Sequence, residues 1–232
     1  MVREICFDTE TTGLDPIKGD HRIVEIGCVE IVNKVRTGRI FHKYINPQRD
    51  MPEEAFRVHG LSEEFLKDKP IFKDVAQEFL DFVGDDAKLV AHNASFDMKF
   101  INHHLRDCGH EIIERRFVVD SLLIARNKFP GAGNSLDALC KRFAVDSSRR
   151  TKHGALLDAE LLADVYIELM GGAQISIFDQ DLSQKNKEQK GRNISSKKIA
   201  NFPQRNFSVS DKDLAAHKEF VVQNFKENFW EY

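Results

Sequence analysis

The first 45 residues contain short runs of Ile, Val and Phe separated by polar turns, a pattern typical of strands. We predict strands at Arg3–Phe7, Arg22–Val32 and Arg39–Ile45. Gly13–Pro16 has the composition of a turn and separates the first two strands. The N-terminal part of the chain is therefore predicted to form a small sheet.

The apolar spacing changes to a helical period further along the chain. Ala155–Met170 is apolar almost all round, which predicts a buried central helix that ends at Gly171-Gly172. The remaining predicted elements are helices at Val75–Phe82, Phe96–Cys108, Ser121–Lys128 and Ser135–Phe143, and strands at Lys88–His92 and Val118–Asp120. Three strands followed by alternating helices and strands predict an α/β domain with a mixed sheet.

The composition changes after Gly172. Asp181–Ala200 has few apolar residues, so it cannot bury enough surface to offset its chain entropy and is predicted to be a flexible linker. Apolar residues return from Phe202 onward. We therefore divide the chain into a folded domain at 1–173, a short peptide at 174–180, a linker at 181–201 and a C-terminal segment at 202–232.

Charge and composition limit the possible classes of protein. The net charge of −3 argues against a protein that grips duplex nucleic acid electrostatically, but not against an enzyme that holds a strand end through metal ions. No apolar run reaches the roughly 20 residues of a membrane-spanning helix. The four cysteines show no CxxC pairing, which favours a reducing cytoplasm.

Candidate chemistry begins with Asp8 and Glu10 at the end of the first predicted strand. Residues two positions apart in an extended chain point to the same side, so the two carboxylates should converge. A polar strand end that leads into a turn would give the same pattern, and an Asp-x-Glu pair alone is weak evidence.

Asp97 is more informative because it shares a helical face with Ile101, Leu105 and Cys108. A carboxylate on an apolar stripe is costly to bury unless another group compensates it. The alternative is that Asp97 lies in the first turn of the helix and complements the helix dipole.

His153 and Asp158 form the third element. They would not share a face of one helix, but they can approach a common site if His153 precedes the helix and Asp158 lies one turn inside it. Asp158 lies on a stripe with Leu161, Leu162 and Val165. A salt bridge in the core is the alternative, although no Lys or Arg lies on the same stripe.

Three segments therefore each place an acid where the pattern expects an apolar residue. Hard oxygen ligands suit Mg²⁺ or Mn²⁺, and two such ions could hydrolyse a phosphodiester. A histidine side chain titrates near neutrality, so His153 could accept the proton of the attacking water.

Three motifs resemble the Asp-Glu-Asp-Asp exonuclease superfamily in its histidine-bearing form. They are Asp8–Leu14, His92–Asp97 and His153–Asp158, in the order and spacing of the family, and the likeness extends over about 1–172. The resemblance implies a ribonuclease-H-like fold with a five-stranded mixed sheet. It also implies 3′→5′ exonuclease activity with two divalent metal ions.

The resemblance assigns roles to individual residues. Asp8, Glu10 and Asp158 would hold the metals, Asp97 would complete the site, and His153 would be the general base. Val58-His59-Gly60 resembles a family element that lines the pocket for the terminal nucleotide. The expected substrate-binding residues are Thr9, Thr11, Gly13, Leu14, Val58, His59, His92, Asn93 and Phe96.

The chain after the double glycine suggests protein partners. Gln174–Phe178 resembles the pentapeptide by which bacterial proteins dock on the sliding clamp, with Gln174, Ile177 and Phe178 as its contact residues. The alternative is that Ile177 and Phe178 fold back on the domain.

Ser210–Asp213 has the capping-box pattern that opens a helix, and Asp211–Tyr232 is predicted to be helical. The expected docking residues are Leu214, Val221, Phe225, Phe229 and Trp230. This segment is similar to the one by which proofreading subunits of bacterial DNA polymerase III bind the catalytic (alpha) subunit. Packing back on the domain is the alternative.

Three functions remain open at this stage. The first is a proofreading exonuclease that acts on a DNA 3′ end within a replicase. The second is a free RNA-processing exonuclease of the RNase T or oligoribonuclease kind, which would need neither docking segment. The third is a non-catalytic replisome scaffold, against which the complete set of acids and His153 argues.

Overall fold

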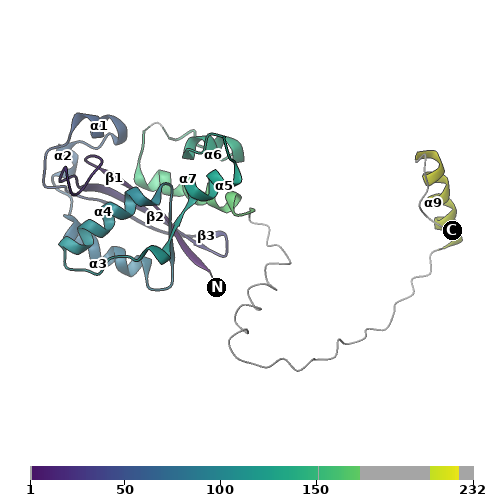
Figure 1. Cartoon of the computed structure of the whole chain (residues 1–232), viewed down its shortest axis with the longest axis horizontal. Coiled ribbons are helices and arrows are strands. Elements are labelled where there is room, and N and C mark those ends of the chain that lie inside the picture. The colour runs from purple at the N-terminus through teal and green to yellow at the C-terminus, as the bar shows by residue number, and fades with distance from the viewer. Residues whose placement is uncertain (1, 151, 173–209, 225–232) are drawn as a thin grey trace, which may run out of the picture. The chain divides into compact units, whose positions relative to one another are not determined.

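The computed structural model describes residues 2–150, 152–172 and 210–224 (Figure 1). The chain divides into two compact units, 1–177 and 178–232, and each is described by itself. Among the described residues, no helix is both long enough and apolar enough to cross a membrane.

A five-stranded mixed sheet forms the centre of the first unit, as predicted. The strand order is β3-β2-β1-β4-β5. β1 pairs antiparallel with β2 and β2 with β3, whereas β1, β4 and β5 run parallel. The strands are β1 (Arg3–Thr11), β2 (Ile23–Val32), β3 (Val35–Tyr44), β4 (Lys88–Ala91) and β5 (Val118–Asp120).

Most predicted elements are present with shifted ends. β1 continues past its predicted end at Phe7 because residues up to Thr11 still pair with β2. The short helices α1 and α2 were missed because their exposed sequences carry no clear apolar stripe. The helices are α1 (Glu53–His59), α2 (Glu63–Leu66), α3 (Phe72–Val83), α4 (Ala94–Asp107), α5 (Ser121–Lys128), α6 (Leu136–Phe143) and α7 (Ala155–Leu169), with a 3-10 turn η1 (Arg115–Phe117).

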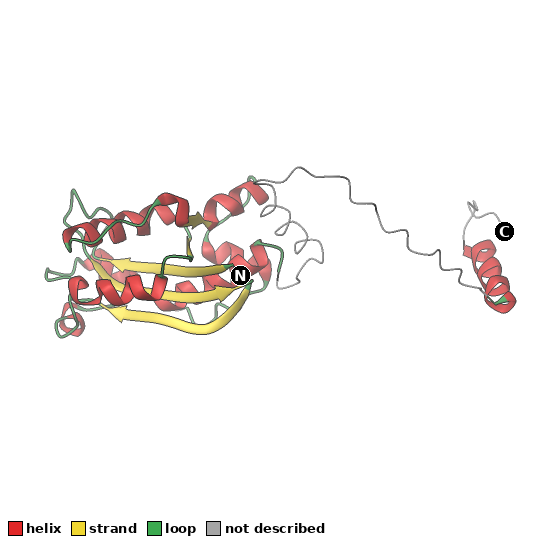
Figure 2. Ribbon diagram, turned by 90° about the horizontal axis from the view of Figure 1, so that it is seen from below, coloured by secondary structure: helices red, strands yellow, loops and turns green. Residues whose placement is uncertain are grey.

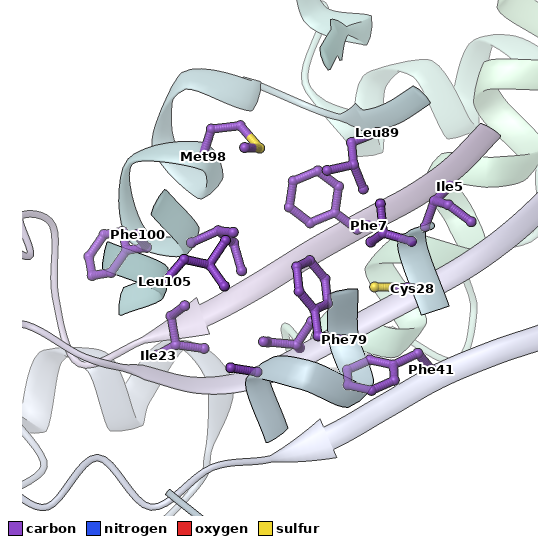
Figure 3. Packing of buried hydrophobic residues seen from close by; sticks show 14 of the residues in the cluster. Ile5, Phe7, Ile23, Cys28, Phe41, Phe79, Leu89, Met98, Phe100 and Leu105 are labelled. Carbon is purple, nitrogen blue, oxygen red and sulfur yellow. The ribbon is translucent and has the colours of Figure 1, made fainter. Parts of the chain in front are cut away.

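Side chains of β1 alternate between two cores, because successive residues of a strand point to opposite faces. Ile5 and Phe7 pack with Phe79 of α3 and Phe100 of α4 on one face (Figure 3). Cys6 points to the other face, where it joins a cluster with residues of α7. Helices therefore cover both faces of the sheet (Figure 2).

Gly27 of β2 permits the close approach of α7 to the sheet. A Cβ atom at Gly27 would lie 2.3 Å from the backbone nitrogen of Leu156. Gly27 is also the cross-strand partner of Asp8. The absent side chain thus brings the first turn of α7 over the part of β1 that carries the first acids.

In the second unit the structure describes the helix α9 (Asp211–Asn224). Its start is as predicted: the backbone N–H of Asp213 donates to Ser210 Oγ (3.2 Å). Leu214 is exposed and Val221 is buried. The continuation of the predicted helix to Tyr232, with Phe225, Phe229 and Trp230, lies outside the described residues, as do Gln174, Ile177 and Phe178.

Candidate active site

Asp8 and Glu10 lie inside β1, not beyond its end. They continue the row of Cys6 on the face that α7 covers, since strand residues two apart share a face. Their cross-strand partners in β2 are Gly27 and Glu25. The two carboxylates therefore converge on one side of the sheet, as the sequence predicted.

Asp97 lies in the first turn of α4, directly after the parallel strand β4, and is buried. Its Oδ1 accepts hydrogen bonds from the backbone N–H (3.1 Å) and the hydroxyl (2.7 Å) of Thr9. Both interpretations of Asp97 thus hold in part. Its carboxylate lies in the first turn of the helix, and hydrogen bonds from Thr9 also compensate its burial. The carboxyl ends of parallel strands are where ligands bind in α/β sheets.

Asp158 lies in the first turn of α7 and His153 precedes that helix. Their side chains meet, with His153 Nδ1 3.1 Å from Asp158 Oδ2. Asp158 is buried, whereas the side chain of His153 is half exposed. His153 before the helix and Asp158 in its first turn is the arrangement under which the sequence allows both residues to approach one site.

Arg150 is the site residue that sequence reasoning missed. Its Nε donates to Asp158 Oδ1 (2.6 Å) and its Nη2 to Asp158 Oδ2 (2.7 Å). The helical stripe of Asp158 contains no cation, because the pairing cation comes from the loop before the helix. The available signal was the basic run that directly precedes His153.

The electrostatics of the site follow from burial and crowding. Burial and the nearby Asp97 and Glu10 raise the pKa of Asp8 well above its ordinary value. Burial, Asp158 and Glu25 raise the pKa of Glu10 to about 8. Burial raises the pKa of Asp97 to about 7, although the hydrogen bonds from Thr9 oppose the shift.

The donor set fits a hard divalent cation. Glu10, Asp158 and His153 offer ligand atoms that all lie within 4.8 Å of one another. The ionisation of crowded carboxyl groups with raised pKa values becomes favourable when these groups share a cation. The geometry by itself allows His153 to be either a ligand or a base.

Two clefts meet at Thr9, Glu10 and Phe96. The first, about 760 Å³, contains the four acids and His153, and the second, about 680 Å³, extends from Glu10 toward α1. Of the residues expected to bind substrate, His92 and Asn93 line the first cleft, and Thr9 and Phe96 line both. The remainder line the second cleft: Thr11, Gly13, Leu14, Val58 and His59.

Two of the histidines that line these clefts, His92 and His59, differ in the hydrogen bonds that they can still form. The ring nitrogens of His92 lie 3.0 Å from Ser121 Oγ and 2.9 Å from the carbonyl oxygen of Asn134. His59 Nδ1 accepts from the backbone N–H of Leu61 (3.0 Å), so the ring proton lies on Nε2. That buried Nε2 has no hydrogen-bond partner among the described residues. His59 Nε2 can thus donate to a ligand in the second cleft, with the backbone of Thr11 as the competing partner.

Comparisons with known proteins identify the family of the chain. A family model described as Exonuclease matches residues 5–166. The chain is 51% identical to DNA polymerase III subunit epsilon of Rickettsia conorii, and the match covers 97% of each chain. The chain belongs to the DNA polymerase III epsilon subunit family.

Other relatives extend the match. The chain is 48% identical to DNA polymerase III subunit epsilon of Salmonella typhimurium over 77% of this chain and 75% of that one. A solved structure of Exonuclease X in complex with 5′ overhanging duplex DNA is 28% identical, with a TM-score of 0.56, and covers 73% of this chain and 91% of that one. This epsilon family member is thus a metal-dependent 3′→5′ exonuclease with a proofreading role.

Proposed function

We propose that this chain removes mispaired nucleotides from the 3′ end of DNA by two-metal-ion hydrolysis, as the proofreading subunit of DNA polymerase III in the cytoplasm. The observation that carries the proposal is the convergence of four acids from β1, α4 and α7 at one cleft, with His153 beside Asp158.

Asp8, Glu10 and Asp158 would hold two Mg²⁺ or Mn²⁺ ions, and Asp97 would complete the site. Such ions stabilise negative charge on a phosphodiester and lower the pKa of water. Oxygen ligands favour these two metals over softer ones. Asp97 contributes by its fixed position, because both Thr9 hydrogen bonds hold its carboxylate against β1.

His153 would accept the proton of the attacking water. Its side chain is half exposed to the cleft, and its Nδ1 lies 3.1 Å from Asp158 Oδ2, so the carboxylate can orient the ring. The remaining ring nitrogen, Nε2, would then take the proton.

The second cleft would hold the terminal nucleotide. Leu14 and Val58 expose apolar side chains there, and Phe96 joins the two clefts. Apolar side chains contact a base without reading its identity, which suits an enzyme that must remove any mispaired nucleotide. His59 Nε2 would donate to a polar group of that nucleotide.

Digestion of a 5′-labelled single strand tests the proposal. With Mg²⁺ the label should pass through a ladder of strands shortened from the 3′ end, and EDTA should stop the reaction. An RNA strand of the same sequence should be degraded more slowly. Faster degradation of the RNA would favour the RNA-processing alternative, and inertness toward both strands would favour the scaffold.

Gln174–Phe178 should bind the sliding clamp independently of catalysis. Ile177 and Phe178 would be the anchors, since buried apolar and aromatic anchors carry most of the energy of a small interface. Replacing both with alanine should weaken binding to the clamp in a pull-down and leave digestion of a short single strand unchanged. Equal clamp retention of wild type and variant would refute this assignment.

The segment at 202–232 should bind the alpha subunit of the polymerase, with 181–201 as a leash. The 20 residues of Asp181–Ala200 would reach on the order of 25 Å as a random coil. Tethering at that range raises the local concentration of the nuclease to about millimolar. Truncation after Gln180 should therefore abolish co-elution with the polymerase subunit and leave digestion of a short single strand intact.

A shuffled linker is the control for the truncation. Reordering Asp181–Ala200 at constant composition should change neither activity nor co-elution, because a leash depends on length and not on order. If the truncated chain still co-eluted, the docking surface would lie on the exonuclease domain instead.

A further inference from the structure

Arg150 lies at the centre of the acidic site, although it belongs to none of its motifs. Its side chain is only 10% exposed. Besides the two bonds to Asp158, its Nη1 donates to Asp137 Oδ1 of α6 (2.5 Å), and its Nη2 lies 2.8 Å from His153 Nδ1. The guanidinium thus contacts two acids and the candidate base at once.

The bonds of Arg150 occupy both carboxylate oxygens of Asp158. Nε and Nη2 engage Oδ1 and Oδ2 side by side, the paired geometry in which arginine binds carboxylates most strongly. A metal ion held by Asp158 needs at least one of these oxygens. Arg150 and the metal are therefore competitors for the same atoms.

We propose that Arg150 is the counter-cation of the metal site: it pairs with Asp158 when no metal is bound, and metal binding displaces it. The inference rests on the proposed assignment of Asp158 as a metal ligand. Arg150 would be a positioning residue, because its paired contact holds the Asp158 carboxylate in one orientation before the ion arrives. A buried, unpaired carboxylate would otherwise be costly.

Asp137 gives the displaced side chain a place to remain. Its carboxylate is 59% exposed and already accepts from Nη1, so Arg150 can leave Asp158 without losing its other partner. Displacement then requires a change of side-chain position and no unfolding of the loop.

Displacement would also change the hydrogen bonding of His153. A guanidinium nitrogen can only donate, so its contact with Nδ1 makes that atom an acceptor and leaves the ring proton on Nε2. Once Arg150 has moved, Nδ1 can donate to Asp158 Oδ2, which lies 3.1 Å away. Nε2 then carries a lone pair, as a general base requires. Metal binding and activation of the base would thus be linked through one side chain.

The test is Mn²⁺ binding to the EDTA-treated full chain, measured by calorimetry without DNA. Arg150→Ala should bind Mn²⁺ about tenfold more tightly than wild type, which corresponds to the removal of about 1.4 kcal/mol of competition. Its melting temperature without metal should fall, and the rise on adding Mn²⁺ should exceed that of wild type.

Arg149→Ala is the matched control, because it removes the same charge from the same loop. The Arg149 side chain is 77% exposed and lies 3.7 Å from Glu160, so its loss should change Mn²⁺ affinity by no more than about twofold. If Arg150→Ala does not fold, Arg150→Lys replaces it, with a smaller gain in affinity because an ammonium cannot form the paired contact.

Unchanged or weaker Mn²⁺ binding by the Arg150 variant, with normal binding by wild type, would overturn the inference and leave the proposed function intact. Binding to wild type that is unaffected by Asp158→Asn would instead remove the metal assignment on which the inference rests, and both would fail.

Discussion

Replacing Asp8 with alanine should abolish exonuclease activity while leaving the metal-free protein at least as stable as wild type. The substitution removes a proposed direct metal ligand, and with it the charge stabilisation on which phosphodiester hydrolysis depends. It also removes one member of a repelling cluster, since Asp97 and Glu10 both raise the pKa of Asp8. Single-strand digestion and thermal melting in EDTA measure the two effects.

The pH dependence of stability gives the same prediction a second readout. The pKa of Glu10 is raised to about 8 and that of Asp97 to about 7 in the folded protein. An acid with a raised pKa binds more protons in the folded than in the unfolded chain. The free energy of unfolding therefore falls as the pH rises from the ordinary pKa of the acid to its raised pKa in the folded protein. The metal-free wild type should lose stability between about pH 4 and pH 8. Asp8→Ala should lose less.

Asp164→Ala is the matched control for the Asp8 substitution. Asp164 is an aspartate of α7 that pairs with Arg36 at 3.2 Å, away from the site. Its loss should leave activity unchanged. Digestion by Asp8→Ala at a rate near that of wild type would contradict the proposed two-metal site.

His153→Ala should reduce turnover by a factor of about 10² to 10⁴, the usual contribution of a general base. Because His153 is proposed as a base and not a ligand, Mn²⁺ affinity should stay close to that of wild type. His103→Ala is a suitable control, since His103 pairs with Asp107 within α4. A large loss of Mn²⁺ binding by His153→Ala would place the ring in the coordination sphere.

The sequence predicted the elements that carry periodic apolar patterns, but not the geometry that loops impose. Ala155–Met170 is apolar almost all round, which predicts a buried helix, and the structure has α7 at Ala155–Leu169. The observed helix ends one residue earlier than predicted because helix ends fray. α1 was missed because its sequence offers charged residues with no clear apolar stripe. Its end nevertheless supplies Val58 and His59 to the second cleft, and family resemblance found them where periodicity did not.

The candidate site likewise combines features that local rules predict with features that depend on the path of the loops. Strand alternation and helix starts are local rules, so the convergence of Asp8 with Glu10 and the approach of His153 to Asp158 could be anticipated. The pairing of Arg150 with Asp158 depends on the path of the loop before α7, which no periodic pattern encodes. The role of Gly27 likewise depends on how closely α7 crosses β2.

Anomalous diffraction from crystals grown with Mn²⁺ and a nucleoside 5′-monophosphate tests the two-metal site most directly. We expect two manganese peaks about 4 Å apart, bound by Asp8, Glu10 and Asp158, with the nucleotide in the cleft beside them. His153 should lie outside the coordination sphere, and Arg150 should have left Asp158. A single ion bound through His153, or manganese bound away from these carboxylates, would contradict the two-metal site.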